Sequence, residues 1–204
     1  MRAPVQILGD RRLRMQINIV ITGVGGQGTL LASRILGALA ADNSMDVKVS
    51  EVHGMAQRGG NVVTYVRIGD RVHSPLVEYG QADVVLAFEQ LEALRALPYL
   101  KEGGTIVTNE QRMMPMPVIM GAASYPEDIL GQLHDCCRLI SLDALSLREQ
   151  AGSQRAVNIV LMGAMARGME FSSESWERAI AECVPPRTLE TNLKAFDLGW
   201  KSAR

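Results

Sequence analysis

The sequence predicts an α/β fold: a three-layer sheet with a β-hairpin insertion after the second strand and a C-terminal helical extension. Three observations support this prediction. Short β-branched runs alternate with stretches whose apolar residues recur at helical spacing. A glycine-rich turn joins the first such run to the first helix, which is typical of Rossmann-like folds. The last part of the chain, from residue 143 onward, carries only helical patterns.

The composition is that of an ordinary globular protein, and it excludes several function classes. The chain has 204 residues, of which 47% are hydrophobic and 21% charged, and its net charge is -1. This balance predicts neither a nucleic-acid interface nor attraction to a membrane surface. No apolar run approaches the roughly 18 residues of a membrane span. The sparse cysteines, Cys136, Cys137 and Cys183, fit no disulfide framework or metal-ligand spacing. We therefore expect a cytoplasmic protein that binds no metal by itself.

We expect a disordered leader over residues 1–14, followed by one α/β domain over residues 15–204. The leader has arginines but lacks the hydrophobic run of a secretory signal. A strand over residues 16–22, a helix over 29–41 and a strand over 47–52 are predicted to form a right-handed βαβ unit.

The chain then departs from a dinucleotide-binding fold. Residues 61–68 are predicted to form a strand, Gly69 and Asp70 a tight hairpin turn, and residues 71–73 the start of a return strand. A dinucleotide-binding fold would place a second crossover helix at this point.

Strands and helices alternate again in the remainder of the chain. The predicted strands cover residues 82–88, 104–108 and 137–141, with a short one at 118–120, and the predicted helices cover 89–97, 125–134, 143–151, 156–168, 174–182 and 187–198.

The turn after the first strand matches the pattern G-x-G-x-x-G and carries one additional glycine. In this pattern one glycine permits the tight turn, one lets the backbone approach a phosphate, and one lets the helix pack on the strand. The N-terminus of the following helix then offers free N–H groups to an anion. The candidate cofactor-binding residues here are Gly23, Gly25, Gly26, Gln27 and Gly28, with the Gln27 amide as a side-chain donor.

Two interpretations of this turn stay open. With Glu51 as a ribose-binding acid, the chain would be an NAD(P)-dependent or other nucleotide-binding oxidoreductase. Alternatively, the glycines serve only close packing. Because the second half of a dinucleotide-binding fold is not expected, a phosphate or another anion is a better candidate ligand than a whole dinucleotide.

A second glycine-rich loop, SEVHGMAQRGG at residues 50–60, follows the second predicted strand. An arginine there offers a planar fork for a carboxylate or phosphate. Because both loops follow strands at the same sheet edge, we expect them to lie close together. The candidate catalytic residues are Arg58, Gln57 and His53, and Gly59 and Gly60 are candidate cofactor-binding residues. The alternatives are a solvated arginine before a hairpin and a structural hydrogen bond for the histidine.

Taken together, the two loops resemble the gamma-type subunits of 2-oxoacid:ferredoxin oxidoreductases, and in particular the small (beta) subunits of the indolepyruvate type. The matching stretches begin with GVGGQGTLLASRIL and SEVHGMAQRGGNVVTYVRIG. The likeness continues in ADVVLAFEQLEALRALPYLKEGGTIVTN, AVNIVLMGAMA and ETNLKAFDLGW, so it covers residues 15–200.

The resemblance implies a complex that oxidatively decarboxylates a 2-oxoacid, forms acyl-coenzyme A and reduces ferredoxin. Thiamine diphosphate, Mg²⁺ and 4Fe-4S clusters would belong to a partner subunit, with coenzyme A and the 2-oxoacid at a shared site. Arg58 would stabilise an anionic group there. The sequence agrees, because it has no Gly-Asp-Gly thiamine motif and no cluster-binding cysteine run. A free-standing protein that binds acyl-coenzyme A is a further alternative.

Two other features have a structural and a functional interpretation. Asn158 lies among apolar residues of a predicted helix, so it must be hydrogen-bonded, either to a loop near the glycine turn or to a partner. Met113, Met114 and Met116 cluster in a proline-rich segment. They would form a docking surface if exposed, or fill gaps if buried.

Overall fold

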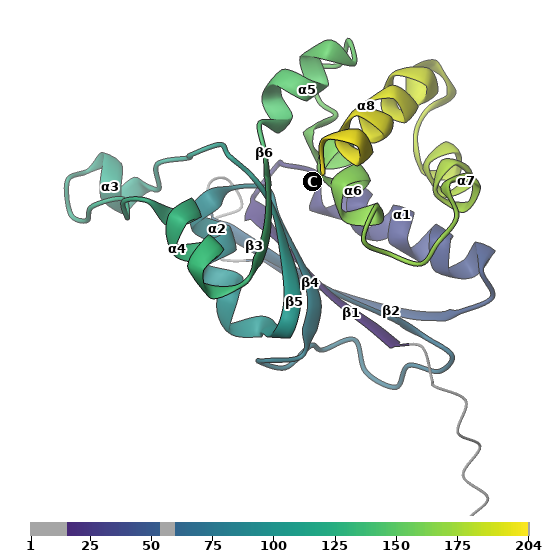
Figure 1. Cartoon of the computed structure of the whole chain (residues 1–204), viewed down its shortest axis with the longest axis horizontal. Helices are drawn as coiled ribbons and strands as arrows, with labels where there is room; N and C mark the ends of the chain where they lie inside the picture. The colour runs from purple at the N-terminus through teal and green to yellow at the C-terminus, as the bar shows by residue number, and fades with distance from the viewer. Residues whose placement is uncertain (1–15, 54–59, 204) are drawn as a thin grey trace, which may run out of the picture.

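The computed structural model describes residues 16–53 and 60–203, which form a mixed sheet with helices on both faces (Figure 1). The strand order is β2-β3-β1-β4-β5-β6. β1, β4, β5 and β6 are parallel neighbours, whereas β3 is antiparallel to both β1 and β2. The strands are β1 (Gln16–Val24), β2 (Asp46–His53), β3 (Asn61–Gly69), β4 (Ala82–Ala87), β5 (Leu100–Asn109) and β6 (Arg138–Leu142).

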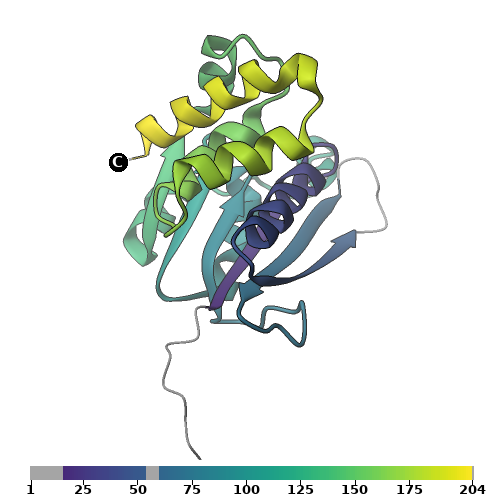
Figure 2. The same ribbon diagram turned by 90° about the vertical axis from the view of Figure 1, so that its right-hand side faces the viewer.

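Two hydrophobic clusters fill the spaces on either side of the sheet. The larger cluster joins the sheet to α1 (Thr29–Asp42), α6 (Val157–Ala166), α7 (Ser173–Cys183) and α8 (Leu189–Ser202) (Figures 1 and 2). The smaller cluster joins the opposite face to α2 (Gln90–Ala96) and α4 (Ile129–Cys136). The remaining helical elements are α3 (Met116–Ile119), α5 (Ala144–Gln150) and the short 3-10 turns η1 (Leu97–Tyr99) and η2 (Pro186–Thr188). The three-layer architecture predicted from the sequence is confirmed.

The hairpin insertion has a different pairing from the one expected. β2 and β3 form the hairpin, and β3 lies between β2 and β1. The predicted turn at Gly69 and Asp70 and the return strand at residues 71–73 are wrong. Both hydrogen-bonding edges of β3 are already used by β1 and β2, so no edge is left for a return strand. The chain instead leaves the sheet, and the Asp46 carboxylate accepts a hydrogen bond from the Val72 N–H at 2.8 Å.

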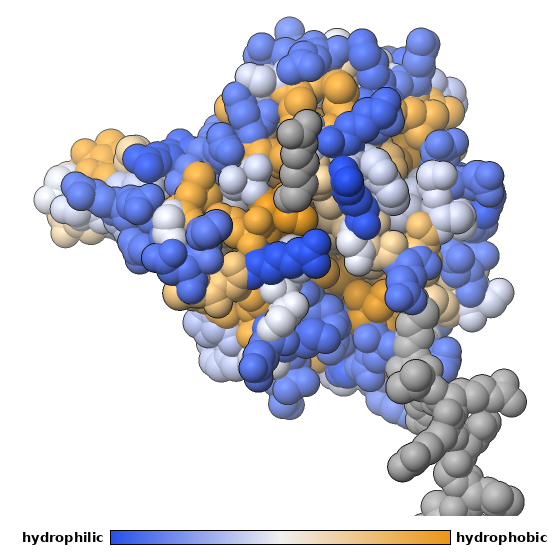
Figure 3. All heavy atoms as spheres, in the orientation of Figure 1, coloured by the Kyte–Doolittle hydropathy of each residue, from blue (hydrophilic) through white to orange (hydrophobic). Residues whose placement is uncertain are grey.

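The short strand predicted at residues 118–120 is also wrong, because α3 forms there. Pro117 is tolerated in the first turn of a helix, where its missing N–H has no helical partner. The Met120 N–H donates to the Met116 carbonyl at 2.9 Å, which closes the turn. α3 projects from the body of the molecule, and its tip is apolar (Figures 1 and 3).

Two glycines bring α6 and α8 into backbone contact. A Cβ added to Gly163 would overlap the Phe196 carbonyl, and one added to Gly199 would overlap the Val160 carbonyl. Phe196 is 5% exposed, and its ring lies 5.6 Å from that of the fully buried Trp176. The close approach therefore lets α8 seal the aromatic part of the larger cluster.

The leader expected over residues 1–14 lies outside the described residues. Within the described part of the chain, no helix has both the length and the apolar composition needed to cross a membrane.

Candidate functional site

The glycine-rich turn lies at the carboxyl end of β1, next to the carboxyl end of β4. α1 follows β1 on one face of the sheet, and α2 follows β4 on the other. Such a switch point is where open α/β sheets bind their ligands. Gly26 and Gly28 have φ values of 96° and 92°, in the region that favours glycine. The sequence therefore placed this turn correctly at the crevice of the sheet.

Asn158 of α6 forms a hydrogen bond with the backbone of the glycine turn. Its side-chain amide donates to the Gly28 carbonyl at 3.3 Å, and the residue is 4% exposed. A Cβ on Gly28 would come within 2.5 Å of that same amide nitrogen. Asn158 thus holds the loop near the glycine turn, which was one of the two roles open from the sequence.

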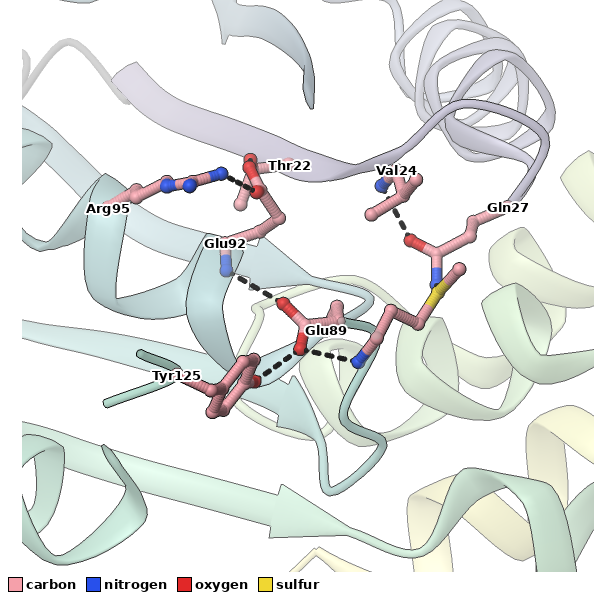
Figure 4. A network of polar contacts seen from close by, with 8 residues as sticks. Thr22, Val24, Gln27, Glu89, Glu92, Arg95 and Tyr125 are labelled. Atoms are coloured by element: carbon pink, nitrogen blue, oxygen red, sulfur yellow. Dashed lines mark hydrogen bonds and ion pairs between the residues drawn. The ribbon is translucent and has the colours of Figure 1, made fainter. Parts of the chain in front are cut away.

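Gln27 also works within the turn. Its side-chain oxygen accepts from the Val24 N–H at 2.7 Å (Figure 4), and its amide donates to the Phe88 carbonyl at 3.3 Å. The same amide lies 3.3 Å from the Met113 sulfur. In this structure the amide fastens the turn to the end of β4 instead of extending toward an anion.

A groove of about 650 Å³ opens over the turn. Gly26 faces open space, because a Cβ there would meet nothing within 4 Å. The N-termini of α1 and α6 border the groove, together with the side chains of Arg148 and Arg155. Helix N-termini and guanidinium groups all favour a bound anion. None of the described residues that line the groove is acidic; they are Gly25, Gly26, Gln27, Gly28, Leu31, Gln111, Met113, Leu145, Arg148, Gln154, Arg155, Val157 and Asn158.

The two glycine-rich loops meet at one point in the described structure. The Gly25 N–H donates to the Gly60 carbonyl at 3.1 Å, which ties the start of β3 to the turn. Gln57, Arg58 and Gly59 lie outside the described residues, and for His53 only the backbone at the end of β2 is described. The expected proximity of the loops therefore holds at the end of the second loop.

A buried carboxylate beside the turn was not found from the sequence. Glu89 directly follows the buried Phe88 and is 1% exposed. Its carboxylate caps α2 by accepting from the Glu92 N–H at 3.1 Å, and it also accepts from the Tyr125 hydroxyl at 2.5 Å (Figure 4). It further accepts from the Met113 N–H at 3.0 Å. Through Met113 and Tyr125, Glu89 thus holds the segment between β5 and α4 close to the crevice.

The groups around Glu89 have shifted pKa values. Burial is the main cause that raises the pKa of Tyr125, and the hydrogen bond to Glu89 is the second cause. The Tyr125 hydroxyl therefore stays protonated and donates. Burial also raises the pKa of Glu92, although its ion pair with Arg95 at 2.5 Å opposes the effect. The sequence does contain a signal that could have identified Glu89: it is an acidic residue directly after a buried strand, at the N-cap position of a helix.

Glu51 does not occupy the ribose-binding position of a dinucleotide fold. It lies on β2, which β3 separates from β1, so it is one strand spacing of about 4.8 Å farther from the turn. The Thr64 hydroxyl donates to its carboxylate at 3.1 Å. This topology argues against the dinucleotide-binding alternative.

The described residues contain no cluster of metal ligands. Over residues 16–53 and 60–203, no three His, Cys, Asp or Glu side chains lie together in a way that could hold a metal ion. The three cysteines are free thiols, with Cys136 exposed and Cys137 and Cys183 partly buried.

Comparison with known proteins places the chain among subunits of 2-oxoacid oxidoreductases. The family model for pyruvate ferredoxin/flavodoxin oxidoreductase matches residues 18–202. Indolepyruvate oxidoreductase subunit IorB of Pyrococcus horikoshii is 45% identical over 195 residues, which is 93% of this chain and 96% of that protein. 2-Oxoglutarate synthase subunit KorC of Methanocaldococcus jannaschii is 31% identical, over 97% of this chain and 99% of that protein.

A solved structure agrees with these matches. The gamma subunit of keto/oxoacid ferredoxin oxidoreductase from Geobacter sulfurreducens superposes with a TM-score of 0.69 at 26% identity, and 92% of this chain and 98% of that one are covered. The resemblance inferred from the two loops is thereby confirmed. The chain belongs to the pyruvate ferredoxin/flavodoxin oxidoreductase family.

Proposed function

We propose that this chain is the non-cofactor-bearing subunit of a 2-oxoacid:ferredoxin oxidoreductase of the indolepyruvate type. The observation that carries the proposal is the 45% identity to an indolepyruvate oxidoreductase subunit over nearly the full length of both proteins. The complex would convert an aryl pyruvate and coenzyme A to acyl-coenzyme A and carbon dioxide, and pass two electrons to ferredoxin.

The described residues fit only some of the groups that such a complex needs. They offer no cluster of metal ligands, so we assign thiamine diphosphate, Mg²⁺ and the 4Fe-4S clusters to the partner subunit. When bound, thiamine diphosphate supplies the electron sink for decarboxylation. The groove over the glycine turn does fit an anionic group, and we assign it to a phosphate of coenzyme A.

Three features of the groove support a phosphate ligand. Gly26 leaves room for close approach to the backbone at the N-terminus of α1. Arg148 and Arg155 supply positive charge from the opposite wall. The Nε–H of Arg148 is buried but finds no hydrogen-bond acceptor among the described residues, although its Nη1 donates to the Gln154 carbonyl at 2.5 Å. A bound phosphate would satisfy that donor.

We expect the substitution Arg148→Gln to raise the KM for coenzyme A by about tenfold or more while kcat changes little. The reason is that a charge-assisted hydrogen bond contributes roughly 1.5–3 kcal/mol and would be lost equally from the ground and transition states. Steady-state kinetics of the complex would measure both constants. Arg187→Gln is the matched control, because Arg187 is exposed on η2 and does not line the groove. An unchanged KM in Arg148→Gln would remove coenzyme A from this groove.

We keep Arg58, Gln57, His53, Gly59 and Gly60 as the proposed active-site loop. The Gly25–Gly60 hydrogen bond supports this, because it brings the end of the loop to the turn. Arg58 would bind an anionic group of the substrate or cofactor.

Co-expression with a thiamine-binding, iron–sulfur partner tests the subunit assignment. We expect the complex to reduce ferredoxin with indolepyruvate and the purified chain alone to be inactive. Arg58→Ala should lower turnover while the two chains still co-purify. Decarboxylation by the isolated chain would contradict the subunit assignment, and wild-type kinetics in Arg58→Ala would remove Arg58 from the site. Calorimetry that showed tight binding of NAD, NADP or FAD would favour the nucleotide-binding alternative.

A further inference from the structure

A second pocket lies on the face of the sheet that carries α6 and α8, away from the glycine turn. It has a volume of about 230 Å³ and opens over β4, β5 and β6. Thr105 pairs with both Val84 and Arg138, so the pocket lies toward the N-terminal ends of β4 and β6. The glycine-turn groove lies beyond the opposite, carboxyl ends of the strands, so the two are separate sites.

Apart from Thr105, the floor of the pocket is apolar. Val84, Val107 and Ile140 lie on one face of three adjacent strands, and Met165 of α6 closes one side. α6 ends at Ala166, and Ala203, which directly follows α8, borders another side of the pocket. Figure 3 shows apolar surface near the middle of this face, beside strongly hydrophilic side chains. An apolar hollow of this kind is typical of a ligand pocket.

Two arginines stand at the rim of the pocket. Arg138 begins β6 and Arg167 follows α6, and both side chains are exposed. The Arg167 Nη1 donates to the Trp200 carbonyl at 3.2 Å, which holds this guanidinium at the end of α8. No carboxylate of the described residues forms an ion pair with either guanidinium. Among the described residues, two guanidinium groups without an ion-pair partner therefore lie beside one largely apolar floor.

We propose that this pocket binds a compact carboxylate with an apolar body. The carboxylate would lie between the forks of Arg138 and Arg167, and the apolar body would lie on Val84, Val107 and Ile140. The volume equals that of roughly eight liquid water molecules, which fits a phenyl-bearing or branched aliphatic acid and is too small for a nucleotide. The proposal does not depend on the assignment of coenzyme A to the glycine-turn groove.

Three small probes separate the contributions of charge and apolar contact. Phenylacetate carries both features, phenylacetamide has nearly the same shape without charge, and acetate has the charge without the ring. Titration of each into the full-length chain, followed by calorimetry or chemical-shift changes, should give one saturable site for phenylacetate with a Kd below about 1 mM. The amide and acetate should each bind at least about tenfold more weakly. Equal affinities for phenylacetate and its amide would overturn the proposal.

Substitutions then locate the site. Arg138→Gln should weaken phenylacetate binding about tenfold, and it leaves the α6–α8 contact untouched. Arg167→Gln should do the same, with thermal denaturation showing whether its contact with Trp200 matters for folding. Arg187→Gln is the control and should bind as the unaltered chain does. If Arg148→Gln abolished binding and Arg138→Gln did not, the probe would occupy the glycine-turn groove, and the second site would be refuted.

Discussion

Replacing Gly199 with alanine is expected to lower the free energy of unfolding by about 3 kcal/mol or more. At the α6–α8 contact the added methyl group would overlap the Val160 carbonyl, which belongs to the backbone and cannot rotate away. The two helices would have to move apart, and the packing of Phe196 against Trp176 would loosen. Overpacking of a rigid core costs about 1–3 kcal/mol, and loss of aromatic contacts adds to it.

Urea denaturation, monitored by circular dichroism, would show the lower free energy of unfolding as a lower urea concentration at the unfolding midpoint. Gly37→Ala is the matched control, because Gly37 also lies inside a helix but would meet no atom within 4 Å. There alanine should leave stability unchanged or raise it by up to about 1 kcal/mol, through its higher helix propensity. If both variants unfolded at the same urea concentration as the original chain, the backbone contact between α6 and α8 would be wrong.

The second large effect is expected on assembly, through the methionine-rich segment around α3. Met114, Met116, Ile119 and Met120 are 49%, 63%, 65% and 74% exposed. The segment projects from the body of the molecule, yet Glu89 holds its base through Met113 and Tyr125. Exposed apolar side chains gathered on a firmly anchored projection are typical of a docking surface. The structure therefore favours docking for Met114 and Met116, whereas Met113 contacts Gln27 within the protein.

The double substitution Met116→Asp and Met120→Asp should weaken binding to the thiamine-binding subunit at least about 100-fold. Two charges would have to be buried in an apolar contact without partners, which costs several kcal/mol. Co-purification and biosensor binding would measure the loss, with circular dichroism to confirm folding. Leu76→Asp is a control at an exposed leucine, 56% accessible, that lies after β3. Wild-type affinity of the double variant would exclude α3 from the interface.

The parts of the fold that local patterns determine could be predicted from the sequence. The glycine turn, the buried strand before it and the apolar face of α1 are all encoded by neighbouring residues, and the structure has them at the expected positions. The pairing of β3 could not be predicted, because strand order depends on contacts between distant residues. The strand pattern of residues 61–69 is compatible both with the predicted hairpin to residues 71–73 and with the observed position between β1 and β2.

The candidate site shows the same division. The turn and the helix N-terminus behind it follow from glycine spacing, and the support from Asn158 follows from the need to satisfy a buried amide. Arg148 and Arg155 could not be identified, since they reach the groove only through the packing of α5 and α6 beside the turn. Glu89 was likewise not identified, because its importance comes from Tyr125 and Met113, far away in the sequence.

The order of the strands along the chain also determines when β1 can pair with its neighbours during translation. Val20, in the middle of β1, pairs with Tyr65 on one side and Val85 on the other. At 5–20 residues per second, the ribosome needs roughly several seconds to supply these partners. Throughout that interval β1 lacks both of the strands that flank it in the folded sheet. We therefore expect chaperones to engage the chain early and to release it once β4 has left the exit tunnel.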